Sequence, residues 1–341
     1  MKDSFFESFQ PVKYRKAVIS QDAKLFDRLK KEFPRLEKNV VLKDHTTFKI
    51  GGPAEYFLSV TRKEELMRAI SIAKKLKIPT FVMGGGSNLL VADKGILGLV
   101  IKNQIQSPLV LRKNHSIEAP AGIALGALVD FSIKNSLQGL EWAGGLPGTF
   151  GGAVRGNAGA FGGEIKDVIF EVTALDNNLN LKKLSFTQCQ FSYRSSIFKK
   201  KNWVVLSAIA KLKKADREML KQIANSRINY RNQKHPLEYP NAGSIFKNVD
   251  VKKIPKKFQP LFLDKVKQDP FPIVPSAWFI IGAGLAGKQI GQAQISTKHS
   301  NYIVNLGGAS AKDVVKLITL VKKEIKKKYG IALEQEIQYL N

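Results

Sequence analysis

Cysteine is nearly absent: the 341 residues include only one, Cys189, and only four histidines. A single cysteine cannot form an intramolecular disulfide or a cysteine-rich metal site, and its neighbours in LSFTQCQFSY favour a thiol packed in a core. None of the histidines shows metal-ligand spacing with an acid or with Cys189. We therefore expect no catalytic metal.

Long hydrophobic runs are also missing. No stretch of roughly 18 or more apolar residues occurs, so no membrane-spanning helix is expected. The N-terminal sequence MKDSFFESFQPVKYRK lacks a basic segment followed by an apolar one, which argues against a signal peptide. With so little cysteine, these features predict a cytoplasmic protein that does not associate with membranes.

Acidic residues are scarce relative to basic ones, with 28 Asp and Glu against 55 Lys and Arg, for a net charge of +27. Such a surplus attracts anions and raises the possibility of a nucleic-acid-binding protein. The basic residues are scattered as pairs and short runs, such as the three lysines at 326–328, and no RNA-binding aromatic motif or zinc finger accompanies them. We interpret most of the charge as solvated surface and expect no nucleic-acid partner.

Hydrophobic periodicity predicts an α+β protein. A helical extension occupies residues 1–44. A β-α-β unit follows, with a strand at 57–60, a helix at 63–76 and a strand at 81–83. Further strands are expected at 97–101, 117–119, 168–175, 203–212 and 331–340, and helices at 216–231 and 314–325. The expected domains are 45–214, with subdomains at about 45–94 and 95–214, and 215–341, with an insertion near 249–276.

Two glycine-rich segments are candidate ligand-binding loops. Residues 84–88, GGGSN, directly follow a predicted strand, and their amides can form an anion-binding nest, although such a sequence is often simply a turn. Nine glycines lie between residues 144 and 163. Each costs about 0.5–1 kcal/mol of backbone entropy relative to alanine, so this density favours a backbone that lies close against a flat, polar cofactor.

A third glycine pattern, GAGLAG at 282–287, matches the GxGxxG spacing of dinucleotide-binding folds. Those folds also need an acid about 20 residues further on, to bind the ribose hydroxyls. No Asp or Glu occurs between Asp269 and Asp313. We interpret the segment as a helix that ends in a glycine-rich turn, and a dinucleotide-binding Rossmann fold is not expected.

Taken together, seven motifs resemble the UDP-N-acetylenolpyruvoylglucosamine reductase family. They occur in the family's order and cover nearly everything from about residue 40 onward. They are 45–54 (HTTFKIGGPA), 84–90 (GGGSNLL), 145–149 (GLPGT), 157–160 (NAGA), 193–198 (YRSSIF), 241–248 (NAGSIFKN) and 333–336 (LEQE). The short path from Arg231 to Ser244 resembles the family variant that lacks an extra tyrosine-bearing loop, whereas 249–276 is longer than that variant leads us to expect.

The resemblance implies a two-part FAD-binding domain of the vanillyl-alcohol-oxidase (PCMH) type, followed by a C-terminal α+β substrate-binding domain. The implied reaction is NADPH-dependent reduction of the enolpyruvyl ether of a UDP-sugar to UDP-N-acetylmuramate, in peptidoglycan precursor synthesis. A monomer is expected. The residues expected to bind FAD are Gly84, Gly85, Gly86, Ser87, Asn88, Pro147, Gly148, Thr149, Gly152, Ala153, Asn157 and Gly159.

The resemblance also implies three catalytic residues. Arg194 would stabilise negative charge on the substrate carboxylate, and Ser244 would donate a proton to the carbanionic carbon. Without the resemblance, Ser244 reads as a turn serine. Glu336, chosen over Glu334 as the second acid of the pair, would hold or protonate the enol intermediate. The expected substrate-binding residues are Tyr193, Lys234, Asn248 and His299.

A second enzyme class remains open: an FAD oxidase with the same cofactor fold that acts on a sugar or an alcohol. Such enzymes often tether flavin through His or Cys, and Cys189 lies outside every glycine-rich segment. The NAGS sequence at 241–244 opposes this alternative.

Overall fold

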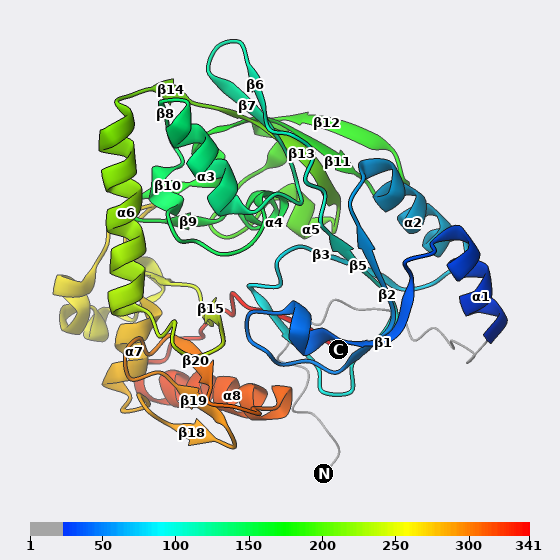
Figure 1. Ribbon diagram of the computed structural model, residues 1–341. Helices are drawn as coiled ribbons and strands as arrows, with labels where there is room; N and C mark the ends of the chain where they lie inside the picture. The colour runs from blue at the N-terminus through cyan, green and yellow to red at the C-terminus, as the bar shows by residue number, and fades with distance from the viewer. Residues whose placement is uncertain (1–22) are drawn as a thin grey trace.

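The computed structural model describes residues 23–341 (Figure 1). Its first part is a four-stranded sheet in the order β1-β2-β5-β3, in which β1 is antiparallel to β2 and the other pairs are parallel. The elements are α1 (Ala23–Glu32), β1 (Glu37–Val41), β2 (Pro53–Val60), α2 (Lys63–Lys75), β3 (Thr80–Met83) and β5 (Ile96–Asn103). The predicted β-α-β unit is confirmed.

Two boundaries of this part differ from those expected. β1 pairs with β2, so residues 37–41 belong to the sheet and not to a separate extension. β5 pairs with both β2 and β3, so the break between the subdomains falls after Asn103 and not near residue 94. Leu29 of helix α1 and Phe33, just after the helix, pack on the same layer, and residues 1–22 of the expected extension lie outside the described residues.

The second part is a five-stranded antiparallel sheet in the order β12-β11-β13-β7-β6. Its strands are β6 (Val110–Arg112), β7 (Ser116–Pro120), β11 (Ile169–Leu175), β12 (Leu181–Ser185) and β13 (Val204–Lys211). α3 (Leu125–Lys134), α4 (Phe150–Gly156) and α5 (Ile197–Lys200) pack against it, and short pairs join β8 (Leu137–Gln138) to β14 (Lys213–Lys214) and β9 (Gly159–Ala160) to β10 (Gly163–Glu164). The lone thiol, Cys189, is fully buried in this core, as expected.

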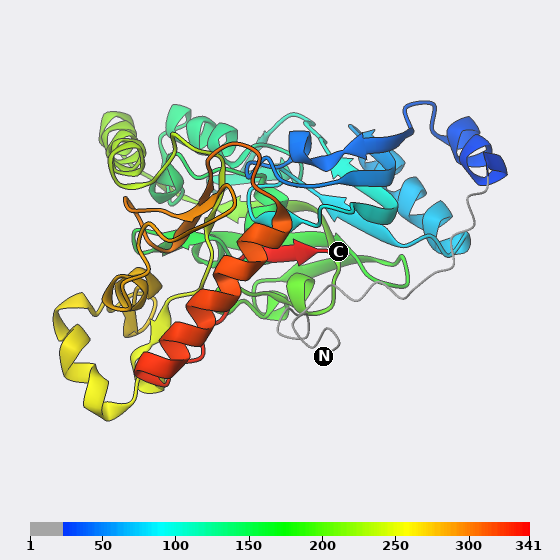
Figure 2. The ribbon, with the colours of Figure 1, turned by 90° about the horizontal axis from the view of Figure 1, so that it is seen from below.

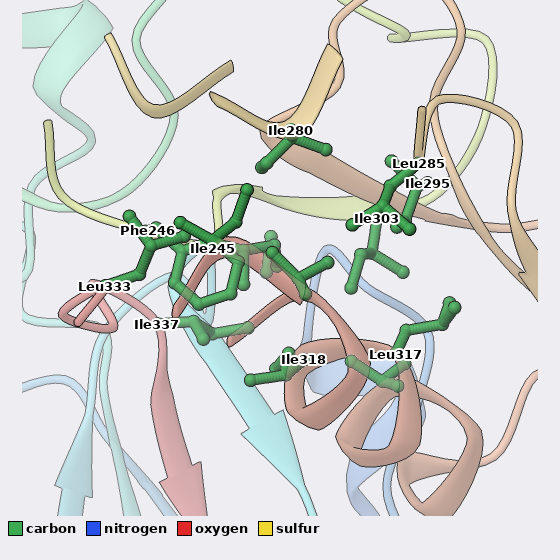
Figure 3. Close-up of a cluster of buried hydrophobic side chains, with 14 of the residues drawn as sticks. Ile245, Phe246, Ile280, Leu285, Ile295, Ile303, Leu317, Ile318, Leu333 and Ile337 are labelled. Atoms are coloured by element: carbon green, nitrogen blue, oxygen red, sulfur yellow. The ribbon is translucent and has the colours of Figure 1, made fainter. Parts of the chain in front are cut away.

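The C-terminal part begins with the long helix α6 (Arg217–Lys234) and contains a sheet in the order β15-β20-β19-β18. Its elements are β15 (Asn241–Ser244), α7 (Ser276–Gly282), β18 (Gln289–Ile290), β19 (Ala293–Ile295), β20 (Tyr302–Asn305) and α8 (Ala311–Tyr329). Figure 3 shows its core, where Leu317 and Ile318 of α8 face Ile295, Ile303, Ile245 and Ile337. This core fixes the chain on either side of two predicted catalytic positions.

The last strand is shorter than expected. Only β21 (Gln338–Leu340) is a strand, and it pairs in parallel with β4 (Leu89–Val91) of the N-terminal half. Before it, one isolated bridge joins Gln335 to Phe246. The C-terminus therefore ties the substrate-binding part to the segment that follows the first glycine-rich loop.

The predicted insertion folds as a compact excursion of short elements: β16 (Val249–Asp250), η6 (Val251–Lys253), η7 (Lys256–Lys265) and β17 (Ile273–Val274). Figure 2 shows it in yellow beside the C-terminal end of α8. Phe262 packs against Phe279 and Tyr329, with ring centroids 4.4 and 5.6 Å apart, so the insertion is anchored in the core. As predicted, the nearby GAGLAG segment is the end of a helix, α7, followed by a turn in which Gly284 has φ +70°.

Across residues 23–341, no helix has the length and apolar character needed to cross a membrane. Within the same range, no three His, Cys, Asp or Glu side chains gather in a way that would hold a metal ion.

Candidate active site

A cavity of about 1520 Å³ opens between the parts of the molecule and is lined by both glycine-rich loops, α4, α6, β15 and the insertion. Pockets for one drug-sized ligand commonly measure roughly 300–1,000 Å³. This cavity has room for a large cofactor together with a second ligand.

The first glycine-rich loop, residues 84–88, packs directly on the second. A Cβ added to Gly84 would lie 2.2 Å from Oγ1 of Thr149, and one on Gly85 would lie 3.0 Å from the Cα of Gly148. Gly86 has φ +65°, and its added Cβ would meet the His45 carbonyl at 2.3 Å. Gly84 and Gly85 therefore allow the two loops to touch, and Gly86 allows the first loop to approach the segment that carries His45.

The second loop presents bare backbone to the cavity. A Cβ on Gly156 would meet nothing within 4 Å, and one on Gly152 would meet only Thr149 Oγ1, at 3.4 Å, so side chains here would fill the cavity itself. Thr149 caps α4 by accepting a hydrogen bond from the Gly152 amide at 3.3 Å. A wall without side chains at the start of a helix fits a flat cofactor that carries phosphate groups.

Every residue expected to bind the cofactor lines this cavity, with the exception of Asn157. Asn157 is fully buried, and its side chain donates to the Ser192 carbonyl at 3.1 Å and accepts from the Lys166 amide at 3.0 Å. Its backbone is left-handed, with φ +44°, at the end of α4. The structure therefore gives Asn157 a supporting position behind the wall, because both faces of its amide are used within the protein.

Ser244 and Glu336 are brought together although 92 positions separate them in the sequence. Ser244 ends β15 and faces Tyr302 of β20 in the antiparallel register. The next residue, Ile245, is buried, and its carbonyl accepts from the Glu336 amide at 2.8 Å. This main-chain contact fixes Glu336 beside the serine, and both line the cavity.

Arg194 lies at the tip of a tight turn closed by mutual main-chain hydrogen bonds between Ser192 and Ser195, and its φ is +54°. Its Nε donates to Glu336 Oε1 at 2.8 Å, and its Nη2 donates to the Gly159 carbonyl at 2.7 Å. Burial acts to lower the pKa of Arg194, but the negative charges of Glu336 and Glu164 outweigh it and raise that pKa above its usual value. The guanidinium is thus permanently charged and held at two points.

Tyr193 and Asn248 complete this group. The Asn248 amide donates to the Tyr193 hydroxyl at 3.3 Å, and the Arg194 guanidinium carbon lies 5.0 Å from the centre of the Tyr193 ring. Burial, above all, raises the pKa of Tyr193, so its phenol stays protonated near neutral pH and can donate a hydrogen bond into the cavity.

Lys199 was not foreseen from the sequence. It belongs to α5 and lines the cavity, and its Nζ donates to the Arg194 carbonyl at 3.1 Å. Burial first, and then the nearby Lys247 and Arg155, lower the pKa of Lys199 to about 8. Lys199 directly follows the YRSSIF motif at 193–198, and this was the available signal.

The two remaining candidates for substrate binding, His299 and Lys234, differ in their position relative to the cavity. His299 lines the cavity, and burial lowers its pKa, so it is neutral near pH 7. Lys234 is exposed at the end of α6, outside the cavity lining. Earlier turns of that helix present Arg227 and Arg231 to the cavity, and each has a buried donor nitrogen without a partner among the described residues. Their spacing of four on a predicted helix was the signal that we missed.

The paired sheets, the bare-backbone wall and the orphaned arginine donors fit a flavin nucleotide and a second anionic ligand. A family model described as an FAD binding domain matches residues 54–185, and one described as the UDP-N-acetylenolpyruvoylglucosamine reductase C-terminal domain matches residues 235–340. The chain is therefore an FAD-dependent oxidoreductase with the predicted two-part flavin domain and α+β C-terminal domain. FAD is its cofactor.

Whole-chain comparisons define the family. UDP-N-acetylenolpyruvoylglucosamine reductase of Clostridium novyi is 38% identical over 94% of this chain and 96% of its own length. The enzyme of that name from Caldicellulosiruptor bescii is 42% identical over 89% of this chain and 90% of its own length. The crystal structure of the Thermus caldophilus reductase superposes with a TM-score of 0.71 and 31% identity, covering 90% of this chain and 99% of that one. The chain belongs to the UDP-N-acetylenolpyruvoylglucosamine reductase family.

Proposed function

We propose that this chain catalyses NADPH-dependent reduction of UDP-N-acetylglucosamine enolpyruvate to UDP-N-acetylmuramate, a step of peptidoglycan precursor synthesis, as a cytoplasmic monomer. The observation that carries the proposal is the meeting of Ser244, Arg194 and Glu336 at one cavity beside the glycine-rich wall. A hydroxyl donor next to a fixed cation is what protonation beside a substrate carboxylate requires.

Bound FAD supplies the capacity to accept a hydride from NADPH and to pass it to an alkene. Hydride addition at the terminal carbon of the enolpyruvyl group leaves negative charge on the carbon next to the carboxylate. Arg194 stabilises that charge through its guanidinium, which Glu336 and the Gly159 carbonyl hold in place. Ser244 then donates its hydroxyl proton to the carbanionic carbon.

The alternative function is an FAD oxidase whose flavin is covalently tethered. The one cysteine of the chain gives this alternative little support. Cys189 is fully buried outside the cavity lining, and burial raises the pKa of its thiol to about 12. A thiol in this state is a poor nucleophile, so it is not a site of flavin attachment.

The test follows the two half-reactions separately. The purified protein should be yellow, NADPH should bleach it, and the enolpyruvyl sugar nucleotide should restore the colour. Ser244→Ala should leave bleaching unchanged while recolouring slows about 10²–10⁴-fold, because a general acid is lost. The matched control is Ser226→Ala, an exposed serine of α6 outside the cavity lining. Equal slowing of both half-reactions in Ser244→Ala would refute the proton-donor role.

A further inference from the structure

The insertion at 249–276 reaches the cavity through one loop, which we define as the clasp, residues 267–273. The cavity-lining residues of the clasp are Lys267, Gln268, Asp269, Pro270 and Ile273. Phe271, which lies between them in the sequence, is outside the lining. The proposed chemistry uses no residue of the clasp.

The clasp is fixed at its base by main-chain hydrogen bonds. The amides of Lys267 and Ile273 each donate to the carbonyl of the other residue, at 2.8 Å. The Val251 amide donates to the Pro272 carbonyl at 3.0 Å, and β17, which begins at Ile273, pairs with β16. Because both residues that follow Phe271 are held in this way, its backbone has little freedom to move.

The side chain of Phe271 contacts Tyr193, a cavity-lining residue of the flavin-binding part of the molecule. The two rings are edge to face, with centroids 5.3 Å apart and an interplanar angle of 83°. This is a favoured geometry for an aromatic pair. Nearby, a Cβ added to Gly162 would lie 2.9 Å from Asp269 Oδ2, so the clasp also lies against the second glycine-rich segment. The clasp therefore spans the two parts of the molecule at this end of the cavity.

The Tyr193 ring is held by three neighbours, and two of them come from the two ends of the insertion. Asn248, directly before the insertion, donates its amide to the Tyr193 hydroxyl at 3.3 Å, and Phe271, near the end, packs on the ring. The Asn248 side chain accepts from the Ser276 amide at 3.4 Å, which joins the two ends. The third neighbour is Arg194, whose guanidinium carbon lies 5.0 Å from the centre of the ring.

We infer that Phe271 is a positioning residue, which fixes the ring of Tyr193 and, through that ring, the guanidinium of Arg194 for the substrate half-reaction. Phe271 acts through Tyr193 because it does not line the cavity itself. Without the Phe271 ring, Tyr193 loses one wall of its packing and the cation loses a fixed aromatic face. The insertion thereby supports the active site. This inference rests on the proposed function, because Tyr193 and Arg194 serve the substrate half-reaction there.

The experiment measures recolouring of the reduced, FAD-loaded protein by a subsaturating concentration of the enolpyruvyl sugar nucleotide, followed by stopped-flow absorbance. Phe271→Leu should slow recolouring about two- to tenfold, the range that corresponds to the loss of one aromatic pair, and should leave bleaching by NADPH unchanged. Phe271→Tyr, which keeps the ring, should recolour like the parent. In Tyr193→Leu protein, the addition of Phe271→Leu should cause no further slowing, because Phe271 then has no ring through which to act. Phe271→Met, of similar bulk to the parent side chain, replaces Phe271→Leu in each comparison if the latter does not retain FAD.

The matched control is Phe258→Leu. Phe258 belongs to the same insertion and packs edge to face on Tyr329 at 5.5 Å, outside the cavity lining. Its loss should lower the melting temperature, as the loss of Phe271 does, and leave both half-reactions as in the parent. If Phe271→Leu recolours like the parent, or slows recolouring equally with and without the Tyr193 ring, the positioning inference is wrong while the proposed function stands. If the enolpyruvyl sugar nucleotide does not recolour the parent protein, the proposed function is wrong and the inference fails with it.

Discussion

The ion pair between Arg194 and Glu336 offers a test that separates catalysis from stability. About a fifth of each side chain is exposed, at 19% and 21%, and the pair joins the two domains at 2.8 Å. Removing one partner of a fully buried pair costs about 3–5 kcal/mol, because the other charge is left desolvated. With this partial exposure we expect Arg194→Met to lower the free energy of unfolding by about 2–3 kcal/mol.

The double variant Arg194→Met/Glu336→Gln removes both charges and should recover most of that stability, since no unpaired charge remains. Activity should behave differently. Recolouring of reduced flavin by the enolpyruvyl sugar nucleotide should be slower by about 10²–10³-fold in both variants, as for loss of one preorganised charge-stabilising group. Bleaching by NADPH should change little in either.

The assays are thermal unfolding and stopped-flow absorbance, with Arg35→Met as the control. Arg35 forms an exposed pair with Glu65, so its loss should cost less than about 1 kcal/mol and leave both half-reactions unchanged. Recovery of recolouring along with stability in the double variant would show that Arg194 serves only to neutralise Glu336.

Three further predictions follow from titratable side chains. Lys199 has a folded pKa of about 8, below its unfolded value, so the unfolded chain binds the extra proton between pH 8 and the usual range of lysine. Lys199→Met should therefore have a higher melting temperature than the parent at pH 7, and the two melting temperatures should converge at high pH. Any decrease in turnover of the parent near pH 8 should be missing in this variant. Burial first, then His299 and Arg231, lower the pKa of His235 to about 4. The melting temperature of the parent should therefore fall as pH decreases from 6.5 towards 4, because the unfolded chain binds a proton that the folded chain does not, and the melting temperature of His235→Gln should fall less. Cys189 should resist iodoacetamide until the protein unfolds, as read by mass spectrometry, because burial raises its thiol pKa to about 12; rapid native labelling would contradict the buried-core assignment.

Hydrophobic periodicity in the sequence is sufficient to predict a helix when one face of that helix is buried and the other is exposed. Leu66, Ala69 and Ala73 lie on one side of α2, and the apolar positions 314, 318, 321 and 325 of the predicted C-terminal helix are buried in α8. The GAGLAG segment was assigned correctly by the lack of an acid after it. These inferences succeed because they depend on local spacing alone.

Inferences that needed three-dimensional placement failed in identifiable ways. Lys234 is the cation expected to face the substrate diphosphate, but α6 faces the cavity through earlier turns, at Arg227 and Arg231, and its last residue is exposed. The expected subdomain break near residue 94 falls before β5, whereas parallel pairing with β2 and β3 keeps β5 in the first sheet. Neither long-range strand pairing nor the rotation of a helix about its axis is encoded in a short motif.

The case of Asn157 shows what the second glycine-rich segment does besides forming the cofactor wall. Its side chain holds the Ser192 carbonyl at 3.1 Å, and Ser196 donates to the Arg155 carbonyl at 2.7 Å, so both sides of the turn that carries Arg194 are fastened to the end of α4. A non-glycine residue with φ +54° is strained and persists only when its surroundings fix it. The wall beside the cofactor and the turn bearing the catalytic cation are therefore one rigid unit. Asn157→Ala should consequently impair Arg194 by releasing its turn, even though the asparagine touches neither ligand.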